Sequence, residues 1–187
     1  MFKRKIAIFL MLSLLFTGCG GKKNQQQDEP APESAQEVLQ TVWNAFSDEE
    51  KFPVYGGDSA NMVDGAPGSF DIADTEGLRY NLLVPEEHLS AIAQAASLMH
   101  GMMVNNFTCG VFRLTDGASA KAFADAMAQS YKNNQWLCGT PERMLIATIG
   151  ERYVFASFGL TDVLTVFEGK LTAAYSNTQV LHTENIA

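Results

Sequence analysis

The sequence contains few of the residues on which most enzyme active sites depend. Only three histidines and three cysteines occur in 187 residues. Neither His-Glu-x-x-His nor a pair of Cys-x-x-Cys motifs is present, so zinc catalysis is not expected. The Gly-x-x-x-x-Gly-Lys phosphate loop and the Gly-x-Ser-x-Gly nucleophile elbow are also absent. These absences predict a protein that is not an enzyme and that carries no cofactor.

Positive charge is scarce as well. Thirteen Lys and Arg residues against 21 Asp and Glu residues give a formal charge of −8. Three of the basic residues, Lys3, Arg4 and Lys5, lie at the start of the chain, and without them the charge falls to −11. Nucleic-acid binding requires a basic surface, so we expect no nucleic-acid partner.

No apolar run reaches the roughly 20 residues that a membrane-spanning helix needs. The longest run at the start of the chain covers the 11 residues from Ile6 to Phe16, with Ser13 as its one polar member, and it follows the basic cluster Lys3-Arg4-Lys5. A basic segment before a short apolar segment is typical of an export signal. The pattern predicts a cleavable signal peptide over residues 1–18.

The residues after the apolar run are Phe16-Thr17-Gly18-Cys19. This segment resembles the lipobox of bacterial lipoproteins, with Phe16 in place of the usual leucine. The resemblance implies that Cys19 is the lipid-modified first residue of the mature protein. Two acyl chains, each contributing about 0.8 kcal/mol per buried CH₂, would then anchor the protein to the lipid bilayer of the cell membrane, on its extracytoplasmic face. The alternative is an incidental thiol in an ordinary secretory signal.

Residues 19–36 have no apolar side chain larger than Ala or Pro, and they predict a flexible tether with a reach of roughly 20 Å. Residues 37–187 have the length of one globular domain. Cys109 and Cys138 leave two alternatives, a disulfide or two reduced core thiols. A disulfide would contribute about 3–4 kcal/mol in the chain-entropy model.

The first half of the domain predicts two helices separated by a long loop. Ser34-Ala35-Gln36-Glu37 has the form of a capping box ahead of an amphipathic helix. Residues 51–74 are irregular and rich in glycine, so we expect a loop that is functional or partly structured. Residues 78–84 fit a strand or a helical turn, and Pro85-Glu86-Glu87 predicts the start of a second helix that continues to residue 103.

The second half alternates strands and helices. Residues 107–114 predict a strand, and a turn at Asp116-Gly117 leads into a helix over residues 118–135. Residues 144–149 and 153–158 predict a β-hairpin, and residues 162–175 predict a last helix. The order predicts an α+β fold, a two-layer sandwich of a small antiparallel or mixed sheet with helices packed mainly on one face.

Four segments between residues 85 and 175 are similar to a known group of proteins: the Met-rich stretch ending at Met103, Phe-Thr-Cys-Gly-Val-Phe-Arg-Leu over residues 107–114, Asp-Gly-Ala-Ser-Ala over 116–120, and Gln-Trp-Leu-Cys-Gly over 135–139. They resemble the uncharacterised small lipoproteins, classed as domains of unknown function, of Gram-positive anaerobes such as Clostridia. The resemblance covers about half of the chain. It implies the α+β fold and the extracytoplasmic location, and it carries no catalytic residue.

One local cluster has metal-binding chemistry. Met99, His100, Met102 and Met103 offer thioether and imidazole ligands suited to Cu(I). Met99 and Met103 also fit the apolar face of the helix expected after Pro85, and methionine fills cores readily. We therefore expect core packing and no metal. The acidic residues of the 51–74 loop do not match the spacing of a calcium loop, so a solvated acidic loop is expected.

The sequence favours a non-enzymatic accessory or protein-binding module of the cell envelope, with the loop over residues 51–74 as its contact region and an unknown envelope protein as its partner. A first alternative is a lipoprotein that binds a small ligand or copper. A second is a cell-envelope hydrolase, which would need His88 or His100 as a base beside Ser59 or Ser69.

Overall fold

The computed structural model describes residues 32–137 and 139–186. The strands are β1 (Val54–Gly56), β2 (Val63–Asp64), β3 (Gly68–Phe70), β4 (Ile92–His100), β5 (Phe107–Leu114), β6 (Arg143–Ile149), β7 (Tyr153–Gly159) and β8 (Thr178–His182). The α-helices are α1 (Ala35–Asn44), α2 (Thr75–Tyr80), α3 (Ala120–Asn133) and α4 (Thr161–Ala174), with short 3₁₀ helices η1 (Glu86–Ala91) and η2 (Val104–Asn106).

The strands form one eight-stranded sheet in the order β2-β1-β4-β5-β7-β6-β8, in which β3 also pairs with β4. Each pairing is antiparallel. The predicted α+β sandwich built on an antiparallel sheet is confirmed. No helix of the described ranges 32–137 and 139–186 combines the length and apolar character needed to cross a bilayer.

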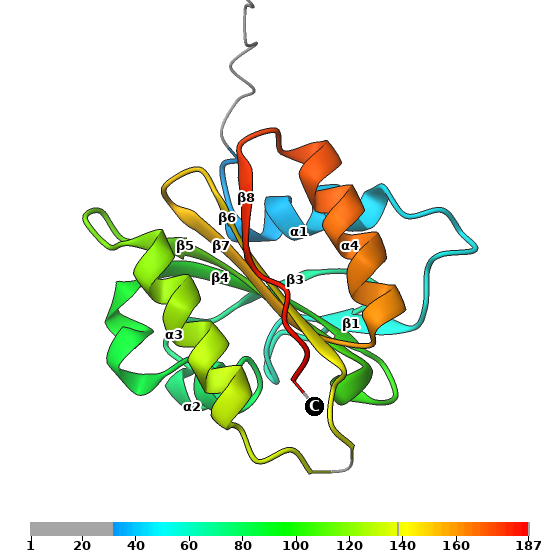
Figure 1. Ribbon diagram of the computed structural model, residues 1–187, viewed down its shortest axis with the longest axis horizontal. Coiled ribbons are helices and arrows are strands. Elements are labelled where there is room, and N and C mark those ends of the chain that lie inside the picture. Colours follow the sequence, from blue (N-terminus) through cyan, green and yellow to red (C-terminus); the bar gives the residue numbers. More distant parts are fainter. Residues whose placement is uncertain (1–31, 138, 187) are drawn as a thin grey trace, which may run out of the picture.

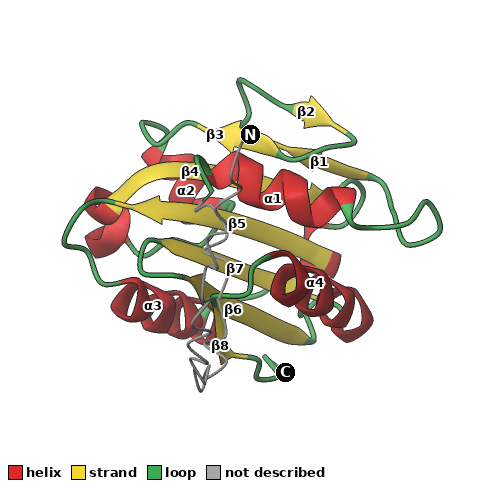
Figure 2. Ribbon diagram, turned by 90° about the horizontal axis from the view of Figure 1, so that it is seen from above, coloured by secondary structure: helices red, strands yellow, loops and turns green. Residues whose placement is uncertain are grey.

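The helices cover both faces of the sheet, whereas the sequence predicted packing mainly on one face. Helices α1 and α4 lie on one side and α2 and α3 on the other (Figures 1 and 2). The reason is visible in β7, where each residue is buried. Phe155 belongs to the core under α1 and α4, while Val154 and Ala156 belong to the core under α2 and α3. A strand buried on both faces needs an apolar layer on each side.

Aromatic rings organise the core on the α1 and α4 side. The Phe167 ring of α4 stacks on Phe107 of β5 with centroids 4.3 Å apart, and it contacts Phe46 at 4.6 Å. Trp43 of α1 stacks on the same ring at 6.3 Å. Three elements far apart in the chain, α1, β5 and α4, therefore meet at one side chain, Phe167.

Strand β4 corrects the sequence analysis, which extended a helix from Pro85 to residue 103. Only the 3₁₀ helix η1 follows Pro85, and residues Ile92–His100 form a central strand. Ala95 and Met99 face the α2 and α3 side, while Ala96 and Leu98 face the α1 and α4 side. A strand buried on both faces has no alternation of apolar and polar residues, so its apolar positions also fit helical spacing.

For two further segments of the first half, the structure selects between the alternatives that the sequence left open. Residues 78–84 contain the end of α2 rather than a strand, which agrees with the helical-turn alternative. The loop over residues 51–74 holds the short strands β1, β2 and β3. This loop is therefore partly structured, and it forms the edge of the sheet next to β4.

The remaining elements agree with the sequence. Strand β5, the β6–β7 hairpin with its turn at Gly150 (φ 58°), and helices α3 and α4 lie within two residues of their predicted bounds. The Ser34 side chain accepts a hydrogen bond from the Glu37 N–H at 3.1 Å, as the capping box requires. The Glu37 carboxylate accepts the N–H of Glu33 at 2.7 Å rather than that of Ser34.

The last residues of the predicted tether contact the domain. The Tyr153 hydroxyl donates to the carbonyl of Pro32 at 2.6 Å, and the Ala35 N–H donates to the Gln94 side chain at 3.4 Å. Helix α1 begins at Ala35, two residues before the predicted start of the domain. The predicted signal peptide, Cys19 and the tether up to residue 31 lie outside the described residues.

Candidate functional site

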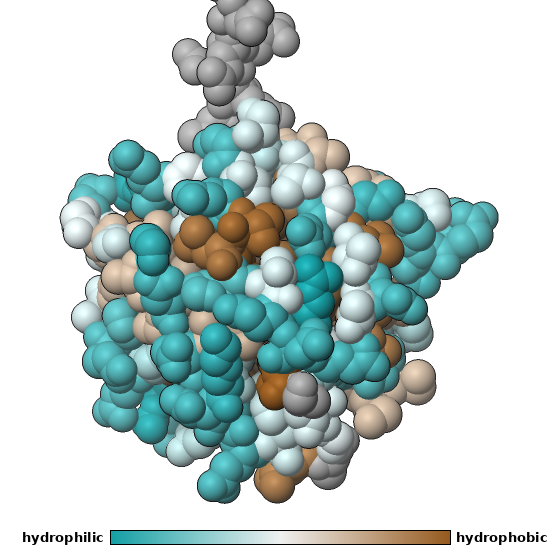
Figure 3. Space-filling model, viewed as in Figure 1, coloured by the Kyte–Doolittle hydropathy of each residue, from teal (hydrophilic) through white to brown (hydrophobic). Residues whose placement is uncertain are grey.

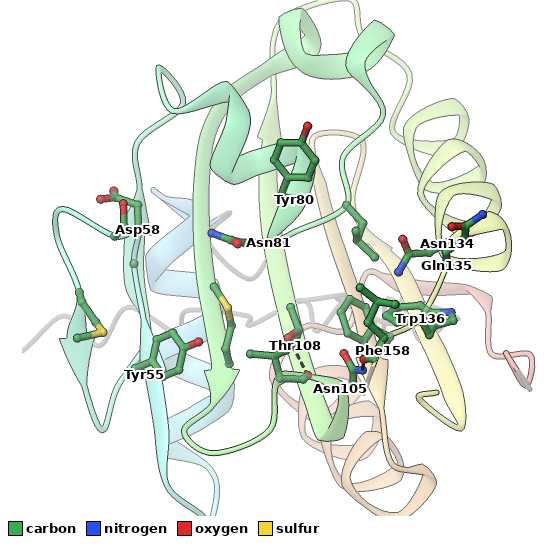
Figure 4. A pocket seen from close by; sticks show the side chains of 17 residues that line it. Tyr55, Asp58, Tyr80, Asn81, Asn105, Thr108, Asn134, Gln135, Trp136 and Phe158 are labelled. Carbon is green, nitrogen blue, oxygen red and sulfur yellow. Dashed lines mark hydrogen bonds between the residues drawn. The ribbon is translucent and has the colours of Figure 1, made fainter. Parts of the chain in front are cut away.

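A pocket of about 610 Å³ opens on the α2 and α3 side of the sheet. Its walls come from β1 and the turn after it, the end of α2, the end of β4, η2 with β5, and the segment that follows α3. Figure 4 shows these side chains around one hollow. The pocket thus joins segments from residue 55 to residue 158, which only the folded sheet brings together.

Aromatic side chains form much of the pocket wall. Tyr55 lies on one wall, Trp136 and Phe158 lie on the opposite wall, and Tyr80 lies at one end (Figure 4). The Trp136 and Phe158 rings meet edge to face with centroids 4.8 Å apart. The Trp136 Nε1 atom is buried and has no hydrogen-bond partner among residues 32–137 and 139–186. The wall therefore offers aromatic surface that packing inside the domain leaves partly uncovered.

Amide and hydroxyl groups lie between these rings. Asn105 and Thr108 serve the fold, because Asn105 Nδ2 donates to the Leu137 carbonyl at 2.9 Å and Thr108 Oγ1 donates to the Val104 carbonyl at 3.0 Å. Within the described part of the chain, three other lining residues make no side-chain hydrogen bond: Asn81, Asn134 and Gln135. These amides are available to a ligand.

The pocket has almost no ionisable groups. Among the described residues that line it there is no Lys, Arg or His, and Asp58 is the one acid. The Asp58 carboxylate is 5% exposed and accepts the N–H groups of Ala60 at 2.8 Å, Asn61 at 2.9 Å and Asp71 at 2.9 Å. The Asn61 side chain adds a further bond at 3.1 Å.

Burial alone would raise the pKa of Asp58, but these N–H donors outweigh burial and hold the pKa below its ordinary value. The carboxylate is therefore ionised at neutral pH and fully occupied by its own loop. Its hydrogen bonds hold the wall segment at residues 58–61 in place and join that segment to residue 71.

Two backbone positions shape the walls. Gly57 has φ 84°, and a Cβ there would lie 2.2 Å from the Asn61 carbonyl oxygen, so only glycine fits. The buried Ser97 hydroxyl donates to the Gly57 carbonyl at 2.8 Å.

Leu83, on another wall, has φ 56°, a left-handed conformation that is uncommon for a leucine. The Ser130 hydroxyl of α3 donates to the Leu83 carbonyl at 2.6 Å and holds this strained turn in place.

Exposed apolar side chains gather at the pocket. Met62, Tyr80, Val104 and Leu137 line it and are 68%, 70%, 44% and 80% exposed. On the face shown in Figure 3, hydrophilic residues predominate and hydrophobic atoms emerge in separate groups. Exposed apolar surface concentrated in one place is typical of a binding site.

The four candidate copper ligands, which the sequence analysis considered and did not favour, do not converge. Met99 lines the pocket, while the neighbouring His100 stacks its ring on Phe52, with centroids 5.3 Å apart. His100 Nδ1 accepts the N–H groups of Met102 at 3.1 Å and Met103 at 3.3 Å, whose side chains are exposed. The helical face proposed for Met99 and Met103 is wrong because β4 is a strand. No group of three or more His, Cys, Asp or Glu residues in the described ranges is placed to hold a metal ion.

The residues of the hydrolase alternative are also separate. Ser59 lines the pocket, but Ser69 donates to Gln36 at 2.7 Å outside it. His88 lies on η1, where its ring meets the edge of Phe123 at 5.9 Å. Neither His88 nor His100 is among the residues that line the pocket beside Ser59.

Cys109 is a free thiol, fully buried in β5 on the side of α1 and α4. Burial raises its pKa well above the ordinary value. The residue agrees with the reduced-thiol alternative. Cys138 lies outside the described residues.

The sequence analysis identified one wall of the pocket and missed the other. The loop over residues 51–74, expected as a contact region, supplies Tyr55, Asp58, Ser59 and Met62. Asn81 and the segment after α3 were not identified as site residues, because a neutral amide or aromatic residue has no motif that marks it in a sequence. The available signal was the polar and aromatic run Asn134-Gln135-Trp136 at the end of a predicted helix.

No protein-family model, curated protein sequence or solved structure shows a significant match to this chain. The resemblance to the small lipoproteins of Gram-positive anaerobes therefore stays a prediction.

Proposed function

We propose that the protein is a non-enzymatic, lipid-anchored binding protein of the cell envelope, whose pocket holds a small organic ligand without negative charge. One observation carries the proposal: the pocket combines a volume of about 610 Å³ with aromatic walls and unpaired amide groups. Small-molecule sites typically occupy about 300–1,000 Å³ and have apolar walls with a few oriented polar groups.

The same lining supports binding rather than catalysis. General acid–base chemistry needs a titratable side chain that can reach the reacting atoms. Asp58 is the one acid that lines the pocket in the described chain, and four N–H groups already occupy its oxygens. Ser59 has no histidine beside it to act as a base.

The envelope location rests on the signal peptide and on Cys19. We expect the wild-type protein to fractionate with membranes after processing, because two acyl chains give durable attachment. Cys19→Ser should release the protein or block its processing. Membrane fractionation followed by immunoblotting measures this, and a Cys19→Ser variant that is processed normally and stays membrane-bound would contradict the proposed anchor.

Ligand binding can be tested on the mature chain carrying Cys19→Ser, which removes the acyl chains. A thermal-shift screen of uncharged and cationic metabolites should give compounds that raise Tm in a concentration-dependent way. Ser59→Trp places a large ring in the pocket and should abolish the shift, while Ser90→Trp, on the exposed surface of η1, should preserve it. Equal shifts in both variants, or none in the unblocked chain, would refute a ligand site here.

A protein-binding module is the second candidate, and the exposed apolar side chains favour it. Met62, Tyr80 and Leu137 project at the pocket mouth and could contact a protein surface. Crosslinking in intact cells, followed by mass spectrometry, should then recover one envelope protein reproducibly. Recovery that persists after Leu137→Asp and Met62→Asp are combined would exclude this surface as the contact.

A further inference from the structure

We infer that the ligand of this pocket is an uncharged saccharide, a short oligosaccharide of neutral sugars. The inference rests on the proposed binding function and names the class of ligand. It follows from three properties of the lining: its charge, its aromatic surface and its unpaired amides.

The charge of the lining excludes anionic ligands first. Phosphates and carboxylates are held by Arg, Lys or clustered N–H groups, and no basic residue lines the pocket in the described chain. The N–H groups that are clustered in its wall already bind Asp58. A zwitterionic amino acid would leave its carboxylate unpaired, so this class is also disfavoured.

Cationic ligands are disfavoured by the placement of the rings and the acid. A cation needs several aromatic faces within about 6 Å or a carboxylate free to pair. Tyr55 and Trp136 lie on opposite walls rather than in a cage, and Tyr80 lies apart from both (Figure 4). Asp58 is turned toward its own loop, where its oxygens accept backbone hydrogens.

The surfaces of a sugar ring complement the aromatic rings and unpaired amides of the pocket lining. Its C–H faces are apolar and pack on aromatic rings, while its hydroxyl groups at the edge both donate and accept hydrogen bonds. Tyr55 and Trp136 supply rings on two walls. An amide is the side chain that donates and accepts at once, so Asn81, Asn134 and Gln135 match the edge hydroxyls.

The polar groups also argue against a fully apolar ligand such as an acyl chain. Burying Asn81 and Asn134 under hydrocarbon would remove their hydration without replacing it, which is unfavourable. A saccharide would replace the water molecules around these amides with its own hydroxyl groups, so the amides would keep hydrogen-bond partners. The pocket volume of about 610 Å³ is enough for more than one sugar ring.

The experiment compares oligosaccharides that differ in charge. The mature chain carrying Cys19→Ser is titrated with neutral tri-N-acetylchitotriose and cellotriose, with cationic chitotriose, and with anionic trigalacturonic acid. Isothermal titration calorimetry gives the affinity, and tryptophan fluorescence reports contact with Trp136. We expect at least one neutral trisaccharide to bind with a Kd between about 1 μM and 1 mM, and both charged ones to bind at least tenfold more weakly.

Two tryptophans allow a matched control, because Trp43 and Trp136 lie on opposite faces of the sheet. Trp136→Ala should weaken binding tenfold or more, Trp136→Phe should keep most of the affinity, and Trp43→Phe should leave affinity and the fluorescence change intact. Circular dichroism melting confirms that each variant folds. Asn81→Ala should weaken binding by roughly fivefold, in line with the loss of one or two hydrogen bonds.

The outcomes separate the two proposals. Tighter binding of chitotriose or trigalacturonic acid would overturn the neutral-saccharide inference while keeping a ligand site. Binding of a non-saccharide compound that Ser59→Trp blocks, with no response to either neutral trisaccharide at about 10 mM, would also overturn it. Absence of any ligand in the thermal-shift screen would overturn the proposed binding function itself.

Discussion

The buried carboxylate of Asp58 gives the sharpest test of how the pocket wall is held. Its two oxygens bind different parts of the loop. Oδ1 accepts the N–H groups of Ala60 and Asn61, at 2.8 and 2.9 Å, and Oδ2 accepts the N–H of Asp71 at 2.9 Å. Residues 58–61 and residue 71 are thereby joined across the loop. We expect Asp58→Asn to loosen this link without changing the size of the side chain.

The magnitude follows from the hydrogen bonds. An asparagine keeps one carbonyl oxygen for the turn at Ala60 and Asn61, but it turns an NH₂ group toward the N–H of Asp71. Hydrogen bonds to a charged group contribute about 1.5–3 kcal/mol, and an unpaired buried donor costs about 1–3 kcal/mol. We therefore expect Asp58→Asn to lower the free energy of unfolding by about 2–4 kcal/mol.

The loss should depend on pH in a defined direction. Because the folded-state pKa of Asp58 lies below its ordinary value, the ionised carboxylate stabilises the fold at pH values above the unfolded-state pKa of about 4. As the pH falls through the folded pKa, that contribution disappears. The difference in unfolding free energy between the wild type and Asp58→Asn should therefore be constant from pH 6 to 7 and shrink at acidic pH.

Urea denaturation followed by circular dichroism measures both quantities. Asp64→Asn is the matched control, since it removes the same charge from an exposed position in the neighbouring strand β2, and it should change stability by less than about 0.5 kcal/mol. An Asp58→Asn protein as stable as Asp64→Asn at pH 7 would refute the role given to the carboxylate. A difference that stays the same at pH 3 would refute its ionic origin.

Three further predictions concern the fold. Phe167→Ala removes the ring on which Phe107 and Trp43 stack, and it should cost about 3–5 kcal/mol in chemical denaturation; a loss under 1 kcal/mol would contradict that packing. Leu83→Gly should be more stable than Leu83→Ala by about 1 kcal/mol, the reverse of an ordinary loop position, because φ is 56°; the two melting curves decide the sign. Cys109, in a variant lacking the other cysteines, should react with a thiol reagent only at the unfolding rate, because burial raises its pKa and blocks access; rapid native labelling would disprove this.

The sequence predicted correctly those elements that are specified by caps, turns and apolar spacing within a few residues. The capping serine at Ser34, the turn at Gly150 and the stripe of apolar residues in α4 each act within a few residues of the chain. Such signals depend on backbone geometry and on one buried face, so they appear in the sequence itself. The hairpin, the α3 and α4 helices and the antiparallel sheet follow from them.

Strand β4 shows where local chemistry was insufficient. Its residues Ala95, Ala96 and Leu98 are good helix formers, and Met99 extends the helical spacing. They form a strand because both sides of the sheet are covered, with Ala96 and Leu98 under α1 and Ala95 and Met99 under the other layer. Burial on two faces depends on the whole sheet and on the helices that cover it. A short stretch of sequence therefore cannot predict it.

The sequence by itself determined the acidic charge and the α+β class, and it predicted an export signal, because each depends on composition or on short-range pattern. The tertiary structure alone decided that helices cover both faces, that Met99 lines the pocket while His100 stacks on Phe52, and that Tyr55 and Trp136 face one hollow. Those two rings lie 81 residues apart in the chain. Uncharged amides and aromatic rings gain a binding role only from the neighbours that folding gives them, whereas a charge cluster or a cap is defined by its sequence neighbours.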